Sequence, residues 1–346
     1  MSSLKKRGLL LVSILLILSM VALASGCSGA KAAQSTNQEE TVKIIHAQGE
    51  TVVKKKPQKV VVFDWGALDT LEQLGIQATA WPQGVAPSYQ TKYISGEYIN
   101  VGDLKNPDFE KITSLKPDLI IISGRQSRQY AEFAAIAPTI NLQLDTKNYM
   151  SSFKTNMRQL ALVFDKQEQM EQELKKIDDQ VAAIRTKVAS GNHRALALMA
   201  IGEKFNASGP GSRFSLIFDV LGMESVWNEP AADSQGEKPK NGPPKNGPPK
   251  DGMPKKGIPD SGRPNNSISN EYIAQTNPDY LFVVDRNAAI GQSGAATQLL
   301  NNEIVNRTNA AINGNIVYLD SSVWYLSGGG LMSMSYMLNE IDQAIH

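Results

Sequence analysis

The side chains best suited to chemistry in this sequence are cations that come soon after apolar segments. Arg125 follows the apolar run LIIIS (119–123), and Arg213 lies in the turn GPGSR (209–213) after the apolar run RALALMAIG (194–202). Apolar runs of this kind predict strands that are buried on both faces, as in a parallel sheet. In open α/β sheets ligands bind beyond the carboxyl ends of the strands, where guanidinium groups can bind anions through charge-assisted hydrogen bonds. The two arginines therefore predict an anion-binding cleft.

Three further side chains share this predicted location at strand ends. Lys105 lies in the turn VGDLKNPD, and Trp324 and Tyr325 follow a predicted strand that ends at Asp320. Aromatic faces attract cations and pack against flat ligands. Together with the two arginines, these residues predict a flat, aromatic ligand that carries several negative charges.

The sequence lacks the motifs of common catalytic and metal sites. Its three histidines are His46, His193 and His346, and no HxxxH, HExxH, GxxxxGK[ST] or GxSxG pattern is present. We therefore expect a protein that is not an enzyme and that holds no metal or cofactor of its own. The segment SGGG (327–330) is typical of a tight turn that leads into a helix, whose first amides can receive an anion. A formal net charge of +1 does not favour nucleic acid as a partner.

The elements that must position these side chains occur twice. The segment KPDLIIISGRQ recurs as NPDYLFVVDRN, so that Arg125 and Arg286 each lie eight residues after a proline that opens a strand. Glu110 and Glu271 each lie seven residues before the same prolines. Further matches relate LDTLEQLGI to SLIFDVLGM and PTINLQLD to GNIVYLD. Alternating strands and helices of this kind predict two similar α/β lobes with parallel central sheets.

One long helix is predicted between the lobes, over 165–190. Asp165 and Glu168 form a capping-box pattern, and apolar residues then recur every three or four positions along one stripe. Such a helix spans about 35 Å, the width of a small domain. We therefore expect an N-terminal lobe over 41–164 and a C-terminal lobe over 191–346, joined by this rigid helix with a ligand cleft between them.

Residues 232–266 do not belong to the repeat. They contain a five-residue period, NGPPK, NGPPK, DGMPK, KGIPD and SGRPN, with little apolar content. Such a composition cannot bury enough surface to fold, so we expect a disordered, solvated and basic insertion in the C-terminal lobe. A tolerated surface loop is the favoured interpretation, and an arm that touches cell wall or anionic lipid is the alternative.

The start of the chain is typical of an exported protein. Three cations precede an apolar run somewhat shorter than a membrane span, which predicts a signal peptide over 1–26. Cys27 follows and is the one cysteine of the chain, so no disulfide can form within it. Its place resembles the lipobox of bacterial lipoproteins, whose cysteine is acylated, although Ala24 stands where leucine is usual. Residues 27–40 would then form a lipidated, flexible tether.

The whole mature chain resembles the iron-siderophore substrate-binding lipoproteins of ABC importers. The resemblance rests on Cys27, on KPDLIIISGRQSR and on the predicted joining helix. The segments GDLKNPDFEKITSLKPD, GPGSRFSLIFDVLGM and VWYLSGGGLMS are similar to those of members that take catecholate siderophores of the petrobactin type.

This resemblance implies a monomeric, extracytoplasmic protein that is lipid-anchored to the outer face of a bacterial cell membrane. It implies capture of a ferric catecholate or mixed catecholate–hydroxycarboxylate siderophore and its delivery to an ABC permease dimer. Since the iron would arrive already chelated, no metal ligand and no cofactor of the protein itself are implied.

The resemblance also assigns residues. Three cations would anchor the anionic ligand and two aromatic rings would pack against it, namely Lys105, Arg125, Arg213, Trp324 and Tyr325. The acidic residues Glu110 and Glu271 occupy the positions at which the family meets arginines of the permease, one on each lobe.

Three alternatives stay open at the level of sequence. A haem or corrinoid binding protein of an ABC importer would need fewer cations and more apolar lining than the predicted cleft. An extracytoplasmic enzyme would need acid and base residues that the motifs do not supply. A surface adhesin would use the basic insertion.

Overall fold

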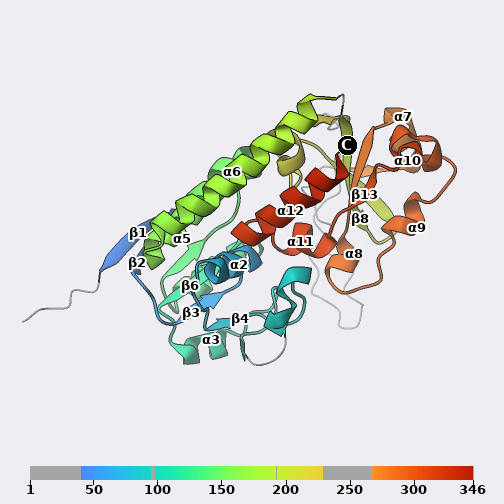
Figure 1. The fold of residues 1–346 in the computed structure, drawn as a ribbon. Helices are drawn as coiled ribbons and strands as arrows, with labels where there is room; N and C mark the ends of the chain where they lie inside the picture. Colours follow the sequence, from blue (N-terminus) through green and yellow to red (C-terminus); the bar gives the residue numbers. More distant parts are fainter. Residues whose placement is uncertain (1–39, 95–97, 192, 229–265, 346) are drawn as a thin grey trace, which may run out of the picture. The chain divides into compact units, whose positions relative to one another are not determined.

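A computed structural model describes residues 40–94, 98–191, 193–228 and 266–345 (Figure 1). All of these residues belong to one compact unit that begins at Glu40. The predicted signal peptide, Cys27 and nearly all of the predicted tether and insertion lie outside the described residues. Within the described ranges, no helix has both the length and the apolar character needed to cross a membrane.

The first lobe is built on a five-stranded sheet in which all neighbouring strands are parallel. The strand order is β5–β4–β3–β6–β7. The strands are β3 (Val60–Val62), β4 (Ala80–Trp81), β5 (Ile99–Asn100), β6 (Leu119–Ile122) and β7 (Thr139–Asn141). All residues of β6 are buried, as expected for a strand that is covered on both faces. An antiparallel hairpin precedes this sheet in the sequence and consists of β1 (Thr41–His46) and β2 (Gly49–Lys54).

The second lobe is built on a six-stranded sheet of order β11–β9–β8–β12–β13, with β10 paired to β8. The pairs β8–β12, β12–β13 and β8–β10 are parallel, whereas β9 is antiparallel to β8 and to β11. The strands are β8 (Arg194–Ile201), β9 (Lys204–Ser208), β10 (Glu224–Ser225), β11 (Ser267–Ile268), β12 (Tyr280–Asp285) and β13 (Ile316–Tyr318). All residues of β12 are buried, as in β6.

Helices lie between the strands in both lobes. Those up to the lobe boundary are α2 (Trp65–Gln73), α3 (Phe109–Leu115), α4 (Tyr130–Ala134), α5 (Tyr149–Phe164) and α6 (Gln167–Ala189). Those after it are α7 (Asn270–Thr276), α8 (Arg286–Ala289), α9 (Ala296–Leu300), α10 (Asn309–Ile312), α11 (Ser321–Leu326) and α12 (Leu331–Ala344). Short 3₁₀ helices are η1 (Ser88–Ile94), η2 (Gly124–Gln129), η3 (Thr146–Asn148) and η6 (Val305–Arg307), and a π-helical turn is η4 (Leu216–Val220).

The sheet orders confirm the predicted internal repeat. Four strands of the first lobe are neighbours in the order β4–β3–β6–β7. The equivalent strands of the second lobe are neighbours in the order β10–β8–β12–β13. The helix after β3 is followed by Gly75, and the helical turn η4 in the second lobe is followed by Gly222. Both glycines have φ in the left-handed region, at 73° and 86°, as the C′ position of a helix requires. Equivalent strands therefore end at equivalent edges of the two sheets.

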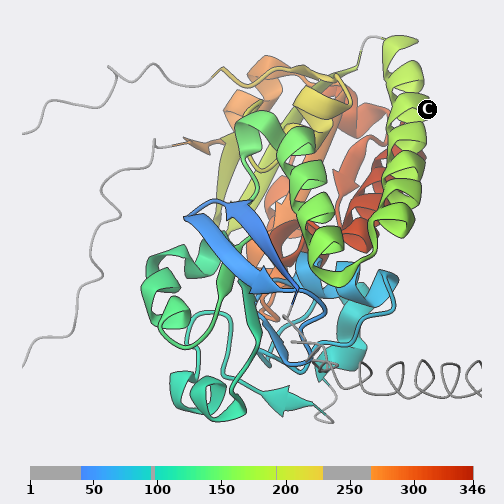
Figure 2. The same ribbon diagram turned by 90° about the vertical axis from the view of Figure 1, so that its left-hand side faces the viewer.

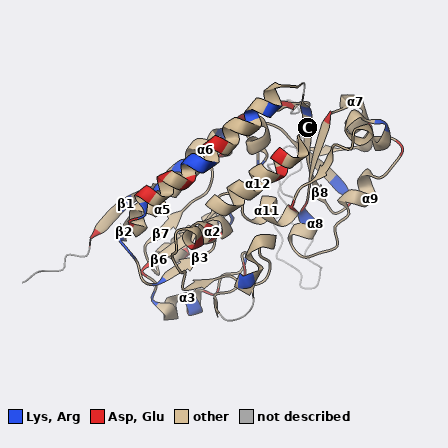
Figure 3. Cartoon of the chain, viewed as in Figure 1, with Lys and Arg blue, Asp and Glu red and all other residues tan. Residues whose placement is uncertain are grey.

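The joining helix is α6, close to its predicted range. Figures 1 and 2 show it passing alongside elements of both lobes, and its side chains bond to α2 and to α12. Its predicted apolar stripe is buried at Met170, Leu174, Ile177, Ile184 and Val188. Its outer face carries charges of both signs (Figure 3), which pair within α6 and with α5 and α12.

The predicted capping box of this helix is wrong. Asp165 does not cap α6, because it adopts a left-handed conformation with φ 54° directly after α5. Its carboxylate instead pairs with Lys55 and Lys56, at 3.1 and 2.9 Å. The residue that precedes α6 is Lys166, whose side chain makes no capping bond. The packing of the apolar stripe, and not the cap, accounts for this helix.

The last helix, α12, belongs to the C-terminal half of the chain but packs against α2 of the first lobe and against α6. Its first amides meet the carboxylate of Asp69 on α2, with Met332 N at 3.2 Å and Ser333 N at 3.0 Å. Thr70 Oγ1 accepts the amide of Leu331 at 3.1 Å. The helix start does receive an acidic group, as the SGGG turn suggested, but that group is the buried Asp69 side chain of the protein itself.

Candidate functional site

A cavity of about 1030 Å³ lies where strands of both sheets end. Its first-lobe wall follows β3, β6 and β7, and its second-lobe wall follows β9 and β12 and includes the end of α11. The lining residues are Asp64, Ser123, Gly124, Arg125, Leu142, Gln143, Leu144, Thr146, Met199, Ile201, Gly211, Ser212, Arg213, Arg286, Tyr325, Leu326, Ser327 and Gly329. The cavity therefore lies between the lobes at the predicted edge of the sheets.

Arg125 comes from the first lobe and reaches across the cavity. It lies on η2, three residues after Ile122, the last residue of β6, and directly after the turn residues Ser123 and Gly124. Its Nη2 donates a hydrogen bond to the backbone carbonyl of Tyr325, which belongs to the second lobe. Its guanidinium carbon lies 4.7 Å from the centre of the Tyr325 ring. Arg125 thus links the two lobes at the predicted anion site.

Arg213 comes from the second lobe, where the turn after β9 passes through Gly211 with φ 70°. Its Nη1 donates to the carbonyl oxygens of Trp324 and Tyr325 at 3.2 and 3.4 Å. Its guanidinium carbon lies 5.0 Å from the centre of the Tyr325 ring. The carbonyl end of α11 thus attracts both Arg125 and Arg213, as the negative end of a helix attracts cations.

Arg286 is a third cation of the cavity, which the sequence analysis did not assign to the site. It begins α8 directly after β12, and its Nε donates to Tyr325 Oη at 3.1 Å. Its guanidinium carbon lies 5.8 Å from the ring centre. The signal that could have found it was present, because Arg286 occupies the place of Arg125 in the internal repeat.

Two of the guanidinium groups beside the Tyr325 phenol change its acidity. Burial alone would raise the pKa of Tyr325, but hydrogen bonds from Arg286 and Arg125 and their positive charge bring that pKa below its usual value. The ring and the backbone carbonyl of Tyr325 hold three positively charged guanidinium groups close together at the cavity. An anion that enters the cavity can therefore meet several guanidinium groups at once.

Asp64 is the one acidic residue among the described residues that line this cavity. It caps α2, accepting the amide of Ala67 at 2.8 Å. Burial raises the pKa of Asp64, against the opposing effects of hydrogen bonds and of the Arg125 charge. Its carboxyl therefore carries less charge at a given pH than an exposed aspartate, and the cavity keeps its basic character.

Two predicted ligand residues do not line the cavity. Lys105 is exposed in the turn between β5 and α3, where Asp103 Oδ1 accepts its amide at 2.7 Å. Trp324 is only 4 % exposed, and its Nε1 donates to Glu340 Oε2 at 2.7 Å. Trp324 and Tyr325 are consecutive in α11, so their side chains point about 100° apart and Tyr325 alone faces the arginines.

The two acidic residues predicted to meet a permease occupy matching places. Glu110 lies in the first turn of α3 and Glu271 in the first turn of α7, and both are exposed. A hydrogen bond with the Ser269 side chain holds the pKa of Glu271 below its usual value. Each helix precedes the equivalent strand of its lobe, β6 or β12, so the two residues are equivalent in the repeat.

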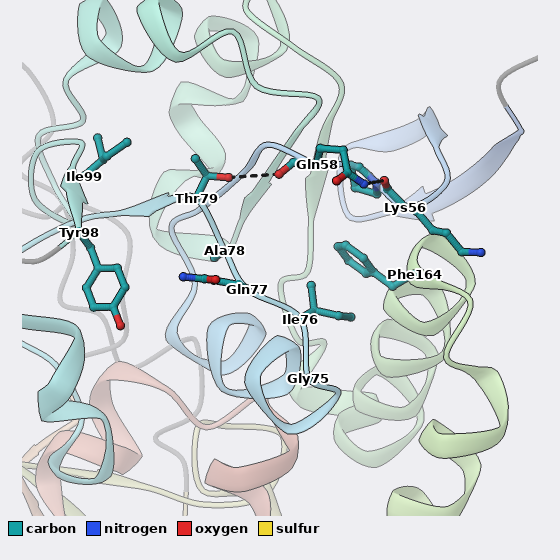
Figure 4. Close-up of a pocket in the computed structure, with 11 residues that line it drawn as sticks. Lys56, Gln58, Gly75, Ile76, Gln77, Ala78, Thr79, Tyr98, Ile99 and Phe164 are labelled. Carbon is teal, nitrogen blue, oxygen red and sulfur yellow. Dashed lines mark hydrogen bonds between the residues drawn. The ribbon is translucent and has the colours of Figure 1, made fainter.

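A second pocket, of about 620 Å³, lies at the amino-terminal ends of the first-lobe strands (Figure 4). Phe164 and Ile76 line it, and Lys56 is the one charged group among the described lining residues. Lys56 is paired with Asp165 and extends away from Gln77 in Figure 4. This pocket lacks the convergent cations of the cavity between the lobes. In the part of the chain that the structure describes, no three His, Cys, Asp or Glu side chains form a group that could hold a metal ion.

The sequence is similar to known binding proteins along nearly its whole length. It is 39 % identical to the petrobactin-binding protein YclQ of Bacillus subtilis over 343 residues, which covers 99 % of each chain. It is 27 % identical to the ferric-anguibactin-binding protein FatB of Vibrio anguillarum, covering 95 % of this chain and 96 % of the relative.

The fold is similar to solved structures of such proteins. The crystal structure of YclQ matches with a TM-score of 0.77 and 40 % identity, over 89 % of this chain and 99 % of that one. The catecholate-siderophore binding protein VctP of Vibrio cholerae matches with a TM-score of 0.73 and 31 % identity, over 88 % and 100 % of the two chains. The family described as periplasmic binding protein matches residues 60–323. With two sheets that meet at one basic cavity, this chain belongs to the periplasmic binding protein family.

Proposed function

We propose that this protein is the substrate-binding component of an ABC importer and that it captures a ferric siderophore for delivery to a membrane permease. The ligand is a catecholate or mixed catecholate–hydroxycarboxylate complex of the petrobactin type. One observation carries the proposal: guanidinium groups from both lobes, Arg125, Arg213 and Arg286, converge on Tyr325 in a cavity of about 1030 Å³. The names of the relatives YclQ, FatB and VctP support it.

The chemistry of the cavity matches that ligand class. A ferric catecholate complex is anionic, and its rings are flat and aromatic. Guanidinium groups bind its oxygens through charge-assisted hydrogen bonds, and they also stack on aromatic faces. The iron needs no ligand from the protein because the siderophore already chelates it. A haem or corrinoid would be served better by a more apolar wall.

Binding can be tested by quenching of tryptophan fluorescence on titration with ferric petrobactin, ferric enterobactin, haem and cobalamin. The chain without residues 1–27 should respond to the ferric catecholates. Arg125→Ala or Arg213→Ala should each weaken this binding by about 2–4 kcal/mol, because each removes a desolvated ionic contact. Arg158→Ala is a matched control, since Arg158 pairs with Glu171 on the outer face of α5 and α6. Unchanged affinity in both cavity variants would show that the ligand does not bind in this cavity. A response to haem or cobalamin alone would show that the ligand is not a ferric catecholate.

We further propose that the mature protein is a monomer anchored by acylated Cys27 to the outer face of the cell membrane. The anchor would hold the lobes near the permease while the tether, 27–40, lets them move. Cys27→Ser should release the protein from the membrane fraction and abolish labelling by a fatty-acid probe. Retention of the variant in membranes would argue against a lipid anchor.

A further inference from the structure

Asp285 is the last residue of β12 and is buried, with 9 % of its surface exposed. Its carboxylate accepts four backbone amides. Oδ1 accepts those of Asn287 and Ala288 at 2.9 and 3.1 Å. Oδ2 accepts those of Ala295 and Ala296 at 2.7 and 2.9 Å. One carboxylate thus closes the segment from the end of β12 to the start of α9 into a single loop.

The loop has a glycine, Gly294, at the position where it passes closest to the Asp285 carboxylate. A Cβ atom added at Gly294 would lie 2.7 Å from Asp285 Oδ2, which is closer than real Cβ atoms approach. Glycine at 294 therefore allows the contact between Oδ2 and the amides that follow. The residue next to Asp285 in this loop is Arg286, the first residue of α8. What fixes the loop also fixes the base of the Arg286 side chain.

A second link runs from Asp285 to the helix that carries Tyr325. The backbone N–H of Asp285 donates to Ser321 Oγ at 2.7 Å, and Ser321 is the first residue of α11. Arg286 Nε donates to Tyr325 Oη at 3.1 Å. These contacts form a closed ring in which Asp285 holds both helices and the two side chains meet on the cavity wall.

The first lobe has no such group at the equivalent place. The internal repeat aligns Asp285 with Gly124, which has no side chain, and Arg286 with Arg125. Arg125 is carried by η2, which contains the buried Gln126. The Nε2 of Gln126 donates to the carbonyl of Leu104 at 2.7 Å. The Asp285 carboxylate is thus specific to the second lobe, and the repeated fold does not require it.

We propose that Asp285 is a positioning residue of the ligand site, whose carboxylate holds α8 so that Arg286 stays at Tyr325 and faces an anionic ligand. The consequence for ligand affinity rests on the proposed function. The positioning itself can be tested without any ligand. An amide in place of the carboxylate would leave two of the four N–H groups facing another donor, so Asp285→Asn should release the loop.

Titration of Tyr325 reports on this positioning in the full-length, ligand-free protein. Its phenol faces three charged groups, Arg125, Arg213 and Arg286. In Asp285→Asn the departure of Arg286 should raise the midpoint of tyrosinate absorbance by roughly 0.5–1 pH unit. Loss of the negative charge of Asp285 alone would lower it. Tyr325→Phe identifies the signal, and a midpoint that is unchanged or lower in Asp285→Asn would overturn the proposal.

A double-variant comparison shows whether Asp285 acts through Arg286. Arg286→Ala should raise the same midpoint, and adding Asp285→Asn to it should cause no further rise, because coupled residues are not additive; only the lowering caused by the lost charge of Asp285 remains. A second full shift in the double variant would overturn the proposal. Gly294→Ala keeps the charge of Asp285 and displaces its carboxylate, so it should reproduce the shift. It serves as the test variant if Asp285→Asn does not fold.

Ligand affinity provides the functional readout. Asp285→Asn should weaken binding of ferric petrobactin by about 10-fold, and in the Arg286→Ala background it should have no further effect. The control Asp108→Asn removes a similar cap, from α3, and should leave affinity unchanged. If the unaltered protein binds no ferric siderophore, the proposed function fails, while the titration of Tyr325 still decides the role of Asp285. Tighter binding in Asp285→Asn would overturn the proposal, since it would show that only the charge matters.

Discussion

Four neighbouring strands have the same order in the two lobes, and each lobe places an arginine beyond the end of an equivalent strand, β6 or β12, yet the lobes hold that arginine differently. In the first lobe Arg125 follows Gly124 and is carried by a 3₁₀ helix. In the second lobe Arg286 follows Asp285, whose carboxylate binds four amides of the surrounding loop. The second lobe also supplies Arg213. A repeated fold therefore fixes where a ligand group can be placed, while local residues decide how rigidly it is held.

This difference suggests a division of labour between the lobes. Arg213, Arg286 and Tyr325 form a wall within the second lobe, and their mutual contacts exist without a ligand. Arg125 is the one guanidinium that the described residues of the first lobe contribute to the cavity, and it reaches the carbonyl of Tyr325. We infer that the second lobe, with two of the three guanidinium groups and Tyr325, forms the principal anion site and that the first lobe adds the third guanidinium group.

The largest effect is expected when the second-lobe wall loses both of its arginines. Replacing both Arg213 and Arg286 by alanine should weaken binding of a ferric catecholate about 1000-fold or more, since two ionic contacts of about 2–4 kcal/mol each are removed. Arg125→Ala alone should lose less. Titration by tryptophan quenching at one fixed salt concentration measures both. Equal losses in the double variant and in Arg125→Ala would contradict the division of labour.

The basic cavity could be predicted from sequence in part. Arg125, Arg213 and Tyr325 were identified from their places after strands and from family resemblance, and all three line the cavity. Lys105 and Trp324 were placed at the same strand ends, but a strand end fixes the backbone and not the direction of a side chain. Trp324 turns inward because its indole N–H finds Glu340 on α12, a contact between segments that no local pattern reveals.

The fold was predicted more completely than the contacts between its parts. Apolar runs and the internal repeat identify the strands, because burial on both faces leaves a clear pattern. The boundary of α6 was harder, since Asp165 suits both a cap and a left-handed turn, and its pairing with Lys55 and Lys56 favours the turn. The packing of α12 on α2 joins residues far apart in the sequence, and only the three-dimensional structure places Asp69 at that joint.

The contact between α12 and α2 at Asp69 should make the free energy of unfolding depend on pH. Asp69 is buried and accepts the Tyr89 hydroxyl at 2.6 Å together with amides of α12. Burial raises its pKa to about 7, above the value of an unfolded chain. Its contribution to stability is therefore complete below about pH 4 and is lost as pH rises through about 7. The loss is on the order of 4 kcal/mol across that window.

Asp69→Asn should remove this dependence, because an amide does not titrate. Denaturation by urea at several pH values between 4 and 8 gives the free energy of unfolding of both proteins. The unaltered protein should lose stability with rising pH more steeply than Asp69→Asn. Parallel curves would show that Asp69 does not titrate in this range and that the joint is indifferent to pH.

A smaller effect on ligand affinity should distinguish how the two lobes hold Arg125 and Arg286. In the first lobe a Cβ at Gly124 would lie 3.2 Å from the side chain of Gln143, which can shift. In the second lobe a Cβ at Gly294 would lie 2.7 Å from the carboxylate of Asp285, which is fixed by four amides. Gly124→Ala should therefore weaken binding at most about 3-fold and Gly294→Ala about 10-fold. Titration of both variants with the same ferric siderophore checks the order, and the reverse order would contradict the inferred difference in rigidity.

The smallest effect concerns delivery, where the lobes should be alike. Glu110 and Glu271 are exposed in the first turns of equivalent helices, one on each lobe, as the proposed docking on a two-subunit permease would require. An acid there also suits the start of a helix, so a purely local role is the competing explanation. Surface ion pairs are individually weak. Each single alanine variant should therefore lower iron uptake at most about 2-fold, and the double variant should lower it several-fold.

Affinity and uptake must be measured separately to distinguish these roles of Glu110 and Glu271. If the two residues dock on the permease, the purified double variant binds ferric siderophore as tightly as the unaltered protein while cells that carry it take up less iron. If they serve only their helices, uptake stays normal and the melting temperature falls slightly. A parallel fall of binding and uptake would show instead that the lobes transmit the change to the cavity, and the assignment of these residues to delivery would then be wrong.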